Sequence, residues 1–131
     1  ADVYLIASDF FAQVADDVDT ALALALKAVE ISDGATRVEG LIRVASAYGA
    51  RQDLPRALQH IEQAIDLDDD VPLLFFIRAF IYLDMGMNQD ALADLRRVEE
   101  MAPDTDVGQQ ARIIRLSVED PGYSPLIPAG R

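Results

Sequence analysis

The chain has 131 residues, no cysteine, one histidine and a net charge of −12 at pH 7. Without cysteine it cannot form a disulfide, a thiol nucleophile or a thiolate metal site, and His60 alone cannot form a zinc-binding cluster. The acidic excess disfavours nucleic acid and anionic membranes as partners, because proteins bind phosphates largely through Lys and Arg. We therefore expect no enzymatic activity, no metal and no cofactor.

The sequence contains no uncharged apolar run of about 18 residues, so we expect no membrane-spanning helix. A soluble protein is favoured, with the cytoplasm slightly preferred. The chain starts at Ala1 and lacks the basic and apolar segments of a secretion signal. Its missing initiator methionine is compatible with a processed product or a piece of a larger protein.

The N-terminal part is predicted to form a helix pair. The first helix is expected from about Val3 to Ala15, with Tyr4, Phe10 and Phe11 among its apolar residues. The second contains small and apolar residues that recur further along the chain at a shift of 36. These are Ala21, Leu22, Ala25, Ala28, Val29 and Ile31, which correspond to Ala57, Leu58, Ile61, Ala64, Ile65 and Leu67.

The middle of the chain repeats itself with a period of 34 residues. The matching positions are Ala45 with Ala79, Tyr48 with Tyr82, Ala57 with Ala91, Leu58 with Leu92, and Ile61 with Leu95. A fixed period of this size indicates a helical repeat, in which each helix pair buries its apolar face against a neighbouring pair. Two departures are visible, because Arg78 replaces Val44 and Val98 replaces Ala64, and we expect a slightly wider helix crossing there.

The pattern resembles the tetratricopeptide repeat family. The resemblance implies an all-α, right-handed superhelical solenoid of antiparallel helix pairs, with about seven helices. Its repeats would cover about 2–35, 38–71 and 72–105, followed by a capping helix at 106–119, a domain spanning 1–120 in all. The remaining residues, 121–131, form an apolar, proline-containing tail.

The family's first helices line an inner surface on which partners bind. The resemblance implies that partner contacts come from Ile42, Arg43 and Ser46 in one repeat, Leu73, Phe76, Ile77 and Phe80 in the next, and Gln110 and Ile114 in the cap. A specialised version of the fold holds a peptide's terminal carboxylate with lysines and asparagines. Arg43 is the only match in charge here, so capture of such a carboxylate is not expected.

Asp66, Asp68 and Asp70 resemble the start of a calcium-binding loop. The match fails at Val71, where the loop needs glycine, and at Ile77, where it needs glutamate. We expect these acids to end one helix and to cap the next.

The helix predicted from Leu73 to Leu83 is hydrophobic nearly all round and is interrupted only by Arg78. A helix with one solvated face should be amphipathic, so both faces of this helix need cover. Either the fold buries the second face internally, or a ligand or subunit covers it.

The last helix is expected to start at Asp104, Thr105 or Asp106, whose side-chain oxygens can cap it. Prolines prevent helix beyond Pro121. The tail residues Tyr123, Pro125, Leu126 and Ile127 either fill the apolar groove of their own or a neighbouring chain, or form a frayed end.

The predicted function is a non-catalytic protein-interaction scaffold that binds a peptide or helix in an apolar groove. One alternative is a self-assembly module, dimeric or polymeric, that uses the same groove or the tail. Another is an accessory region of a larger protein. The sequence does not identify the partner.

Overall fold

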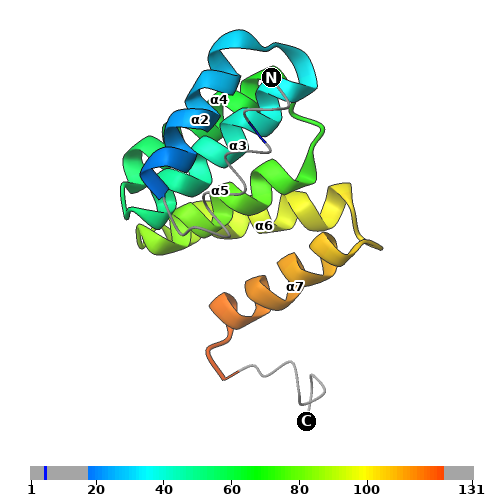
Figure 1. Ribbon diagram of the computed structural model, residues 1–131. Coiled ribbons are helices and arrows are strands. Elements are labelled where there is room, and N and C mark those ends of the chain that lie inside the picture. The colour runs from blue at the N-terminus through cyan, green and yellow to red at the C-terminus, as the bar shows by residue number, and fades with distance from the viewer. Residues whose placement is uncertain (1–4, 6–17, 123–131) are drawn as a thin grey trace. The chain divides into compact units, whose positions relative to one another are not determined.

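The computed structural model describes Leu5 and residues 18–122. This part of the chain contains six α-helices and no strand (Figure 1). The helices are α2 (Val18–Ile31), α3 (Gly34–Ala50), α4 (Leu54–Leu67), α5 (Pro72–Asp84), α6 (Asn88–Met101) and α7 (Asp106–Glu119). The predicted all-α class is confirmed. The helix expected at about Val3 to Ala15, apart from Leu5, and the tail from Tyr123 onward lie outside the described residues.

The chain divides into two compact units, residues 1–69 and 70–131. In the first unit, α2 packs on α3 and α3 packs on α4. Small residues make the α2–α3 approach close. A methyl group placed on Gly40 would lie 2.8 Å from the Val29 side chain. Beside this contact, Leu22 and Ala25 of α2 form a buried cluster with Val44 of α3.

The α3–α4 pair is joined through Tyr48, whose ring centroid lies 5.3 Å from that of His60. The guanidinium of Arg56 lies 5.9 Å from the centre of the same tyrosine ring. His60 is half-buried, and its Nδ1 lies 2.8 Å from the Arg56 carbonyl oxygen. This histidine of α4 therefore takes part in the packing of α4 against α3.

In the second unit, α5 packs on α6, and α7 packs on α6 and also contacts α5. The α5–α6 core contains Phe75 and Ala79 from α5 and Ala91, Leu95 and Val98 from α6. The contribution of α7 is different in kind, because its buried residues are the small Gly108 and Ala111. The predicted cap of α7 is confirmed, since Thr105 Oγ1 accepts a hydrogen bond of 3.2 Å from the Gly108 amide.

The helix ends follow the sequence period. Both ends of α6 lie 34 residues after those of α4, and the end of α4 lies 36 residues after that of α2. Two equivalent positions are completely buried in all three helices. The first is occupied by Ala25, Ile61 and Leu95, and the second by Ala28, Ala64 and Val98. Helix bounds and burial thus repeat together along the chain.

The expected acidic cap of α5 is wrong. Its N-cap residue is Val71, which makes no side-chain capping bond, and Pro72 occupies the first turn. Proline tolerates this position because it has no amide hydrogen to satisfy. Asp68 has the other expected role, since it forms the C-cap of α4.

No helix in the described ranges is both long and apolar enough to cross a membrane.

Candidate functional site

The strongest candidate is an apolar surface on α5. Leu74, Phe75, Ala79 and Ile81 are buried, whereas Leu73 and Phe80 are each 44% exposed. Phe76 and Ile77 are half-buried. We call the four residues with exposed surface, Leu73, Phe76, Ile77 and Phe80, the α5 stripe. Their spacing of i, i+3, i+4 and i+7 places them on one side of the helix.

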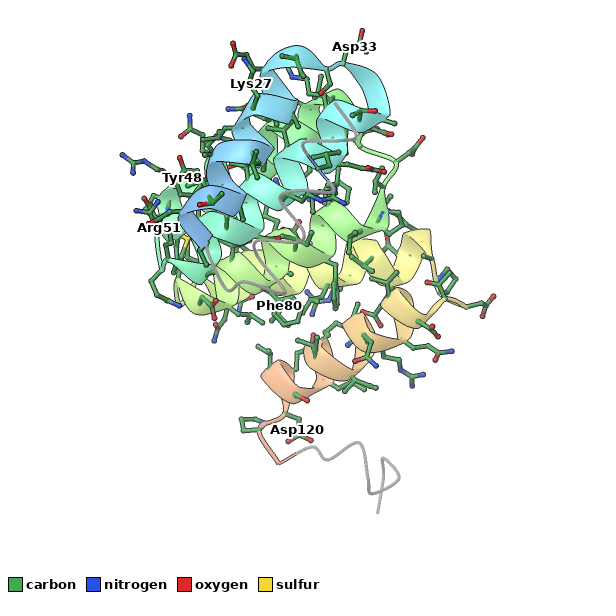
Figure 2. All side chains as sticks on the ribbon, viewed as in Figure 1. Lys27, Asp33, Tyr48, Arg51, Phe80 and Asp120 are labelled. Carbon is green, nitrogen blue, oxygen red and sulfur yellow. The ribbon has the colours of Figure 1, made fainter. Side chains whose placement is uncertain are left out.

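Two aromatic rings order the centre of the stripe. Phe76 and Phe80 are one helical turn apart, and their rings meet edge to face with centroids 4.9 Å apart and planes at 88°. Aromatic pairs prefer this geometry. Figure 2 labels Phe80 on α5. Because each ring restricts the rotation of the other, a ligand would lose less side-chain entropy than it would on isolated phenylalanines.

An ion pair on the opposite side of α5 fixes how the helix is rotated. Arg78 Nε and Nη2 donate to the two carboxylate oxygens of Asp94 at 2.8 and 2.9 Å. Asp94 is 1% exposed, and it accepts a third bond of 3.1 Å from Arg97. The paired guanidinium groups of Arg78 and Arg97 each lie 5.5 Å from the centre of the Phe75 ring. With Arg78 directed at α6, the α5 stripe faces away from α6.

Arg78 stands out in the sequence, whereas its partner Asp94 does not. Arg78 departs from the repeat, and in the structure it forms a bidentate ion pair with Asp94 of α6. A signal was present in the repeat itself. One period earlier, the two positions hold Val44 and His60. An apolar residue and a histidine thus change together into a cation and an anion.

The expected residues of α7 belong to the same unit as the stripe. Gln110 is exposed and Ile114 is half-buried, on a helix that contacts α5. Their helix is attached to α6 by ionic contacts. Arg115 donates to both carboxylate oxygens of Glu99, at 2.5 and 2.9 Å. Glu119 bonds both Arg96 and Arg115.

These bonds change the acidity of the guanidinium. The hydrogen bonds to Glu99 raise the pKa of Arg115 above its ordinary value, and the charges of Glu99 and Glu119 act in the same direction, whereas burial opposes them. Arg115 therefore keeps its charge at every pH near neutrality.

The expected residues of α3 lie in the first unit, and the α5 stripe lies in the second. Ile42 and Arg43 are half-buried and Ser46 is exposed. Arg43 contacts its own helix, with Nη1 3.4 Å from the Glu39 carbonyl oxygen and 3.8 Å from the Glu39 carboxylate. The predicted site residues of α5 thus lie together on one helix face. The predicted residues of α3 belong to the other unit.

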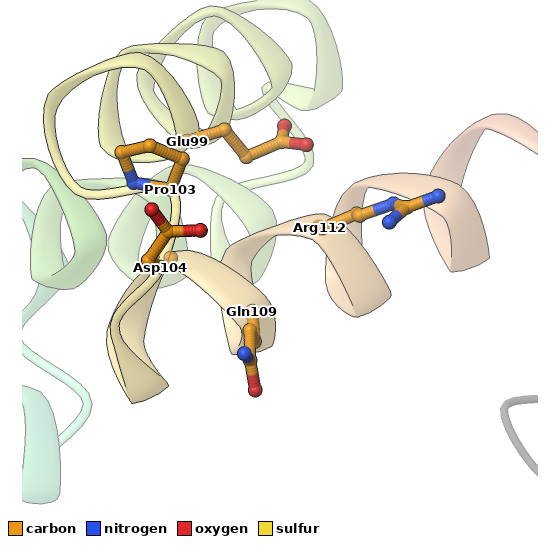
Figure 3. A pocket seen from close by; sticks show the side chains of 6 residues that line it. Glu99, Pro103, Asp104, Gln109 and Arg112 are labelled. Carbon is orange, nitrogen blue, oxygen red and sulfur yellow. The ribbon is translucent and has the colours of Figure 1, made fainter.

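A second candidate is a pocket of about 480 Å³ at the junction of α6 and α7 (Figure 3). Its lining residues are Glu99, Pro103, Asp104, Gly108, Gln109 and Arg112. Glu99 is already held by Arg115. A methyl group on Gly108 would lie 1.8 Å from the Ala102 carbonyl oxygen, so the glycine is explained by helix packing. The pocket therefore offers less for recognition than the stripe does.

The described residues contain no group of His, Cys, Asp and Glu that could hold a metal ion. In the same part of the chain, every buried side-chain nitrogen or oxygen has a hydrogen-bond partner. What the stripe can do chemically is to exclude water against a complementary apolar surface. Comparison with known proteins finds neither a matching family model nor a matching curated protein.

Proposed function

We propose that this chain is a non-catalytic, tetratricopeptide-like scaffold that binds a segment of a partner protein on the α5 stripe. The observation that carries the proposal is the exposure of Leu73 and Phe80 on a helix whose other faces are already buried. Covering a large apolar side chain completely contributes roughly 1.5–3 kcal/mol, so completing the burial of four such residues supplies useful affinity. The ordered Phe76–Phe80 pair lowers the entropic cost of binding.

The repeat-like architecture is supported by the shared bounds of α4 and α6 and by the matching buried positions. In a repeat array, each helix pair covers its neighbour and leaves one surface for a ligand.

A peptide selection tests this function. Random peptides of about 15 residues would be selected on the purified full chain and then measured for binding to two variants. The Leu73→Ser, Phe80→Ser double variant removes the most exposed apolar side chains of the stripe. Met101→Ser is the matched control, because Met101 is 37% exposed and lies at the end of α6.

We expect the selected peptides to be apolar, to bind the double variant at least tenfold more weakly, and to bind the Met101 variant normally. Both altered positions of the double variant are partly exposed, so its circular dichroism spectrum should match that of the wild type. Undiminished binding of the selected peptides to this folded variant would exclude the stripe as the binding surface.

Self-association is the second candidate, and the spacing of the stripe favours it. The intervals between positions 73, 76, 77 and 80 are three, one and three residues, so the spacing is the same in both chain directions. An antiparallel second copy can thus place Leu73 against Phe80 and Phe76 against Ile77, as a two-fold axis requires. Light scattering after size exclusion, over a wide concentration range, measures this directly. Comparison with a chain ending at Asp120 also tests the proposal that the tail participates.

A further inference from the structure

The α5 stripe is followed, one helical turn further on, by the exposed carboxylate of Asp84. Asp84 is the last residue of α5, exposed, four positions after Phe80 and seven after Ile77, and so on the same side of the helix. It makes no ion pair within the described ranges, and the last turn of α5 contains no basic residue. A carboxylate is unfavourable at a helix C-terminus, where the backbone dipole is already negative.

The charge of Asp84 discriminates between occupants of the stripe. An antiparallel second copy would bring Asp84 next to Asp69 and Asp70, shortly before the other copy's α5, and a parallel copy would bring it next to the other Asp84. Like charges at such short range are unfavourable in both arrangements. A segment with a lysine or arginine at this place would pair with Asp84 instead, and the net charge of −12 would attract it from a distance.

Because the side chains of the stripe are apolar, they favour a helical over an extended conformation of the bound partner segment. Leu73, Phe76, Ile77 and Phe80 offer no hydrogen-bond donor or acceptor in their side chains. An extended peptide pressed against them would leave backbone amides and carbonyls unsatisfied, which is costly when water is excluded. A helix satisfies these groups internally, and the stripe extends over about two turns, roughly 10 Å, which suits a helix of similar length.

We propose that the α5 stripe binds an amphipathic helix of another protein, with apolar residues spaced i, i+3, i+4 and i+7 and with a lysine or arginine one turn beyond them that pairs with Asp84. This inference rests on the function proposed above and adds the chemistry of the partner.

A charge exchange tests the inference. Two fluorescent, helix-stapled peptides would share the same apolar residues. One carries lysine one turn before and one turn after them, which allows for either orientation, and the other carries glutamate at both places. Their affinities for the full chain would be measured by anisotropy at low and at physiological salt. The variants are Asp84→Lys and, as a control with the same change in net charge, Asp90→Lys on the exposed surface of α6.

The wild type should prefer the lysine peptide by about two- to fivefold at physiological salt, as exposed ion pairs do. Asp84→Lys should reverse the preference, and Asp90→Lys should leave its direction unchanged. An equal effect of the two variants would show a long-range field without contact at Asp84 and would overturn the inference. So would equal affinity of the wild type for both peptides, or a dimer in place of a complex.

The stripe itself is tested separately in the same assay. If Leu73→Ser, Phe80→Ser abolishes binding while Asp84→Lys changes nothing, the charged contact is wrong and the proposed function stands. If the double variant binds both peptides normally, the proposed function fails as well.

Discussion

Asp94 shows how an acidic chain keeps a carboxylate in its interior. Isolated burial of a charge is very costly, and the group would normally be neutralised or excluded. Here two oxygens accept three bonds, from Arg78 and Arg97. The Phe75 ring lies 5.5 Å from both guanidinium groups. The contact aligns α5 with α6, although a hydrophobic pair at these positions could give comparable stability.

Removing one partner should therefore cost far more than replacing both. We expect Asp94→Ala to lower the free energy of unfolding by about 3–5 kcal/mol, because it removes both hydrogen bonds of the bidentate ion pair between Arg78 and a buried carboxylate. The double variant Arg78→Val, Asp94→His introduces the residues found one period earlier, Val44 and His60, and should lose clearly less than either single change. Urea denaturation of the wild type, Asp94→Ala, the single variants Arg78→Val and Asp94→His, and the double variant measures this. A double variant as unstable as the sum of the singles would contradict the compensation.

At the scale of elements, α7 differs from the other helices. Its buried residues are Gly108 and Ala111, and its apolar residues Ile113, Ile114, Leu116 and Val118 are only half-buried. The close approach at Gly108 and the arginine contacts to Glu99 and Glu119 thus replace part of the apolar core. Both means of attachment can be tested by substitution.

Gly108→Ala should destabilise the fold by about 1–3 kcal/mol, because the added methyl group would lie 1.8 Å from the Ala102 carbonyl oxygen. Gly49→Ala is the matched control on α3. No atom lies within 4 Å of its new methyl group, and a helical glycine gains from alanine, so about 0.4–1 kcal/mol of stabilisation is expected there. The two midpoints of chemical denaturation should move in opposite directions.

Arg115→Ala should loosen α7, at a cost of about 1–2 kcal/mol, since it removes the bidentate contact to Glu99. Arg112→Ala removes the same charge from an exposed arginine that makes no ion pair in the part of the chain described. Hydrogen exchange should show faster exchange of the α7 amides for Arg115→Ala alone. Equal exchange in the two variants would mean that packing alone attaches the helix.

The sequence is a good guide to elements and a weaker one to contacts between them. The period of 34 agrees with the bounds of α4 and α6, and the shift of 36 agrees with the ends of α2 and α4, because small residues recur wherever helices approach closely. The apolar pattern of 73–83 predicts that the second face of this helix needs cover, and the family resemblance supplies the four positions of the stripe. The Arg78–Asp94 pair is not predictable in this way, since it depends on how two helices are rotated. The cap at Val71 was missed because acids near a helix start need not point at its amides.

At the scale of the whole molecule, charge is unbalanced. With 23 acidic residues and 11 lysines and arginines, most carboxylates cannot have a cation of their own. The folded state concentrates this negative charge more than the unfolded chain does, and self-repulsion opposes folding. The pairs at Asp94 and Glu99 offset only part of this repulsion.

Added salt should therefore stabilise the protein. We expect the thermal midpoint to rise between about 10 mM and 150 mM NaCl, as the Debye length falls from about 30 to 8 Å. Glu100→Gln, which removes one exposed negative charge from the last turn of α6, should raise the midpoint at low salt and reduce the response to salt. A midpoint that falls with salt would show that the ion pairs stabilise the folded state more than the repulsion between carboxylates destabilises it.

The Arg78–Asp94 pair also bears on how the chain avoids folding incorrectly. The helix pairs α3–α4 and α5–α6 have similar lengths, equal connections at 51–53 and 85–87, and matching alanines, so α6 could compete with α4 for α3. In that exchange Asp94 would meet Val44 in place of Arg78, and the guanidinium would be left facing His60. Losing the bidentate contact between Arg78 and the buried Asp94 costs about 3–5 kcal/mol, which is enough to reject the wrong partner helix. The ion pair thereby ensures that α6 packs on α5 and not on α3, although the two helix pairs are otherwise similar.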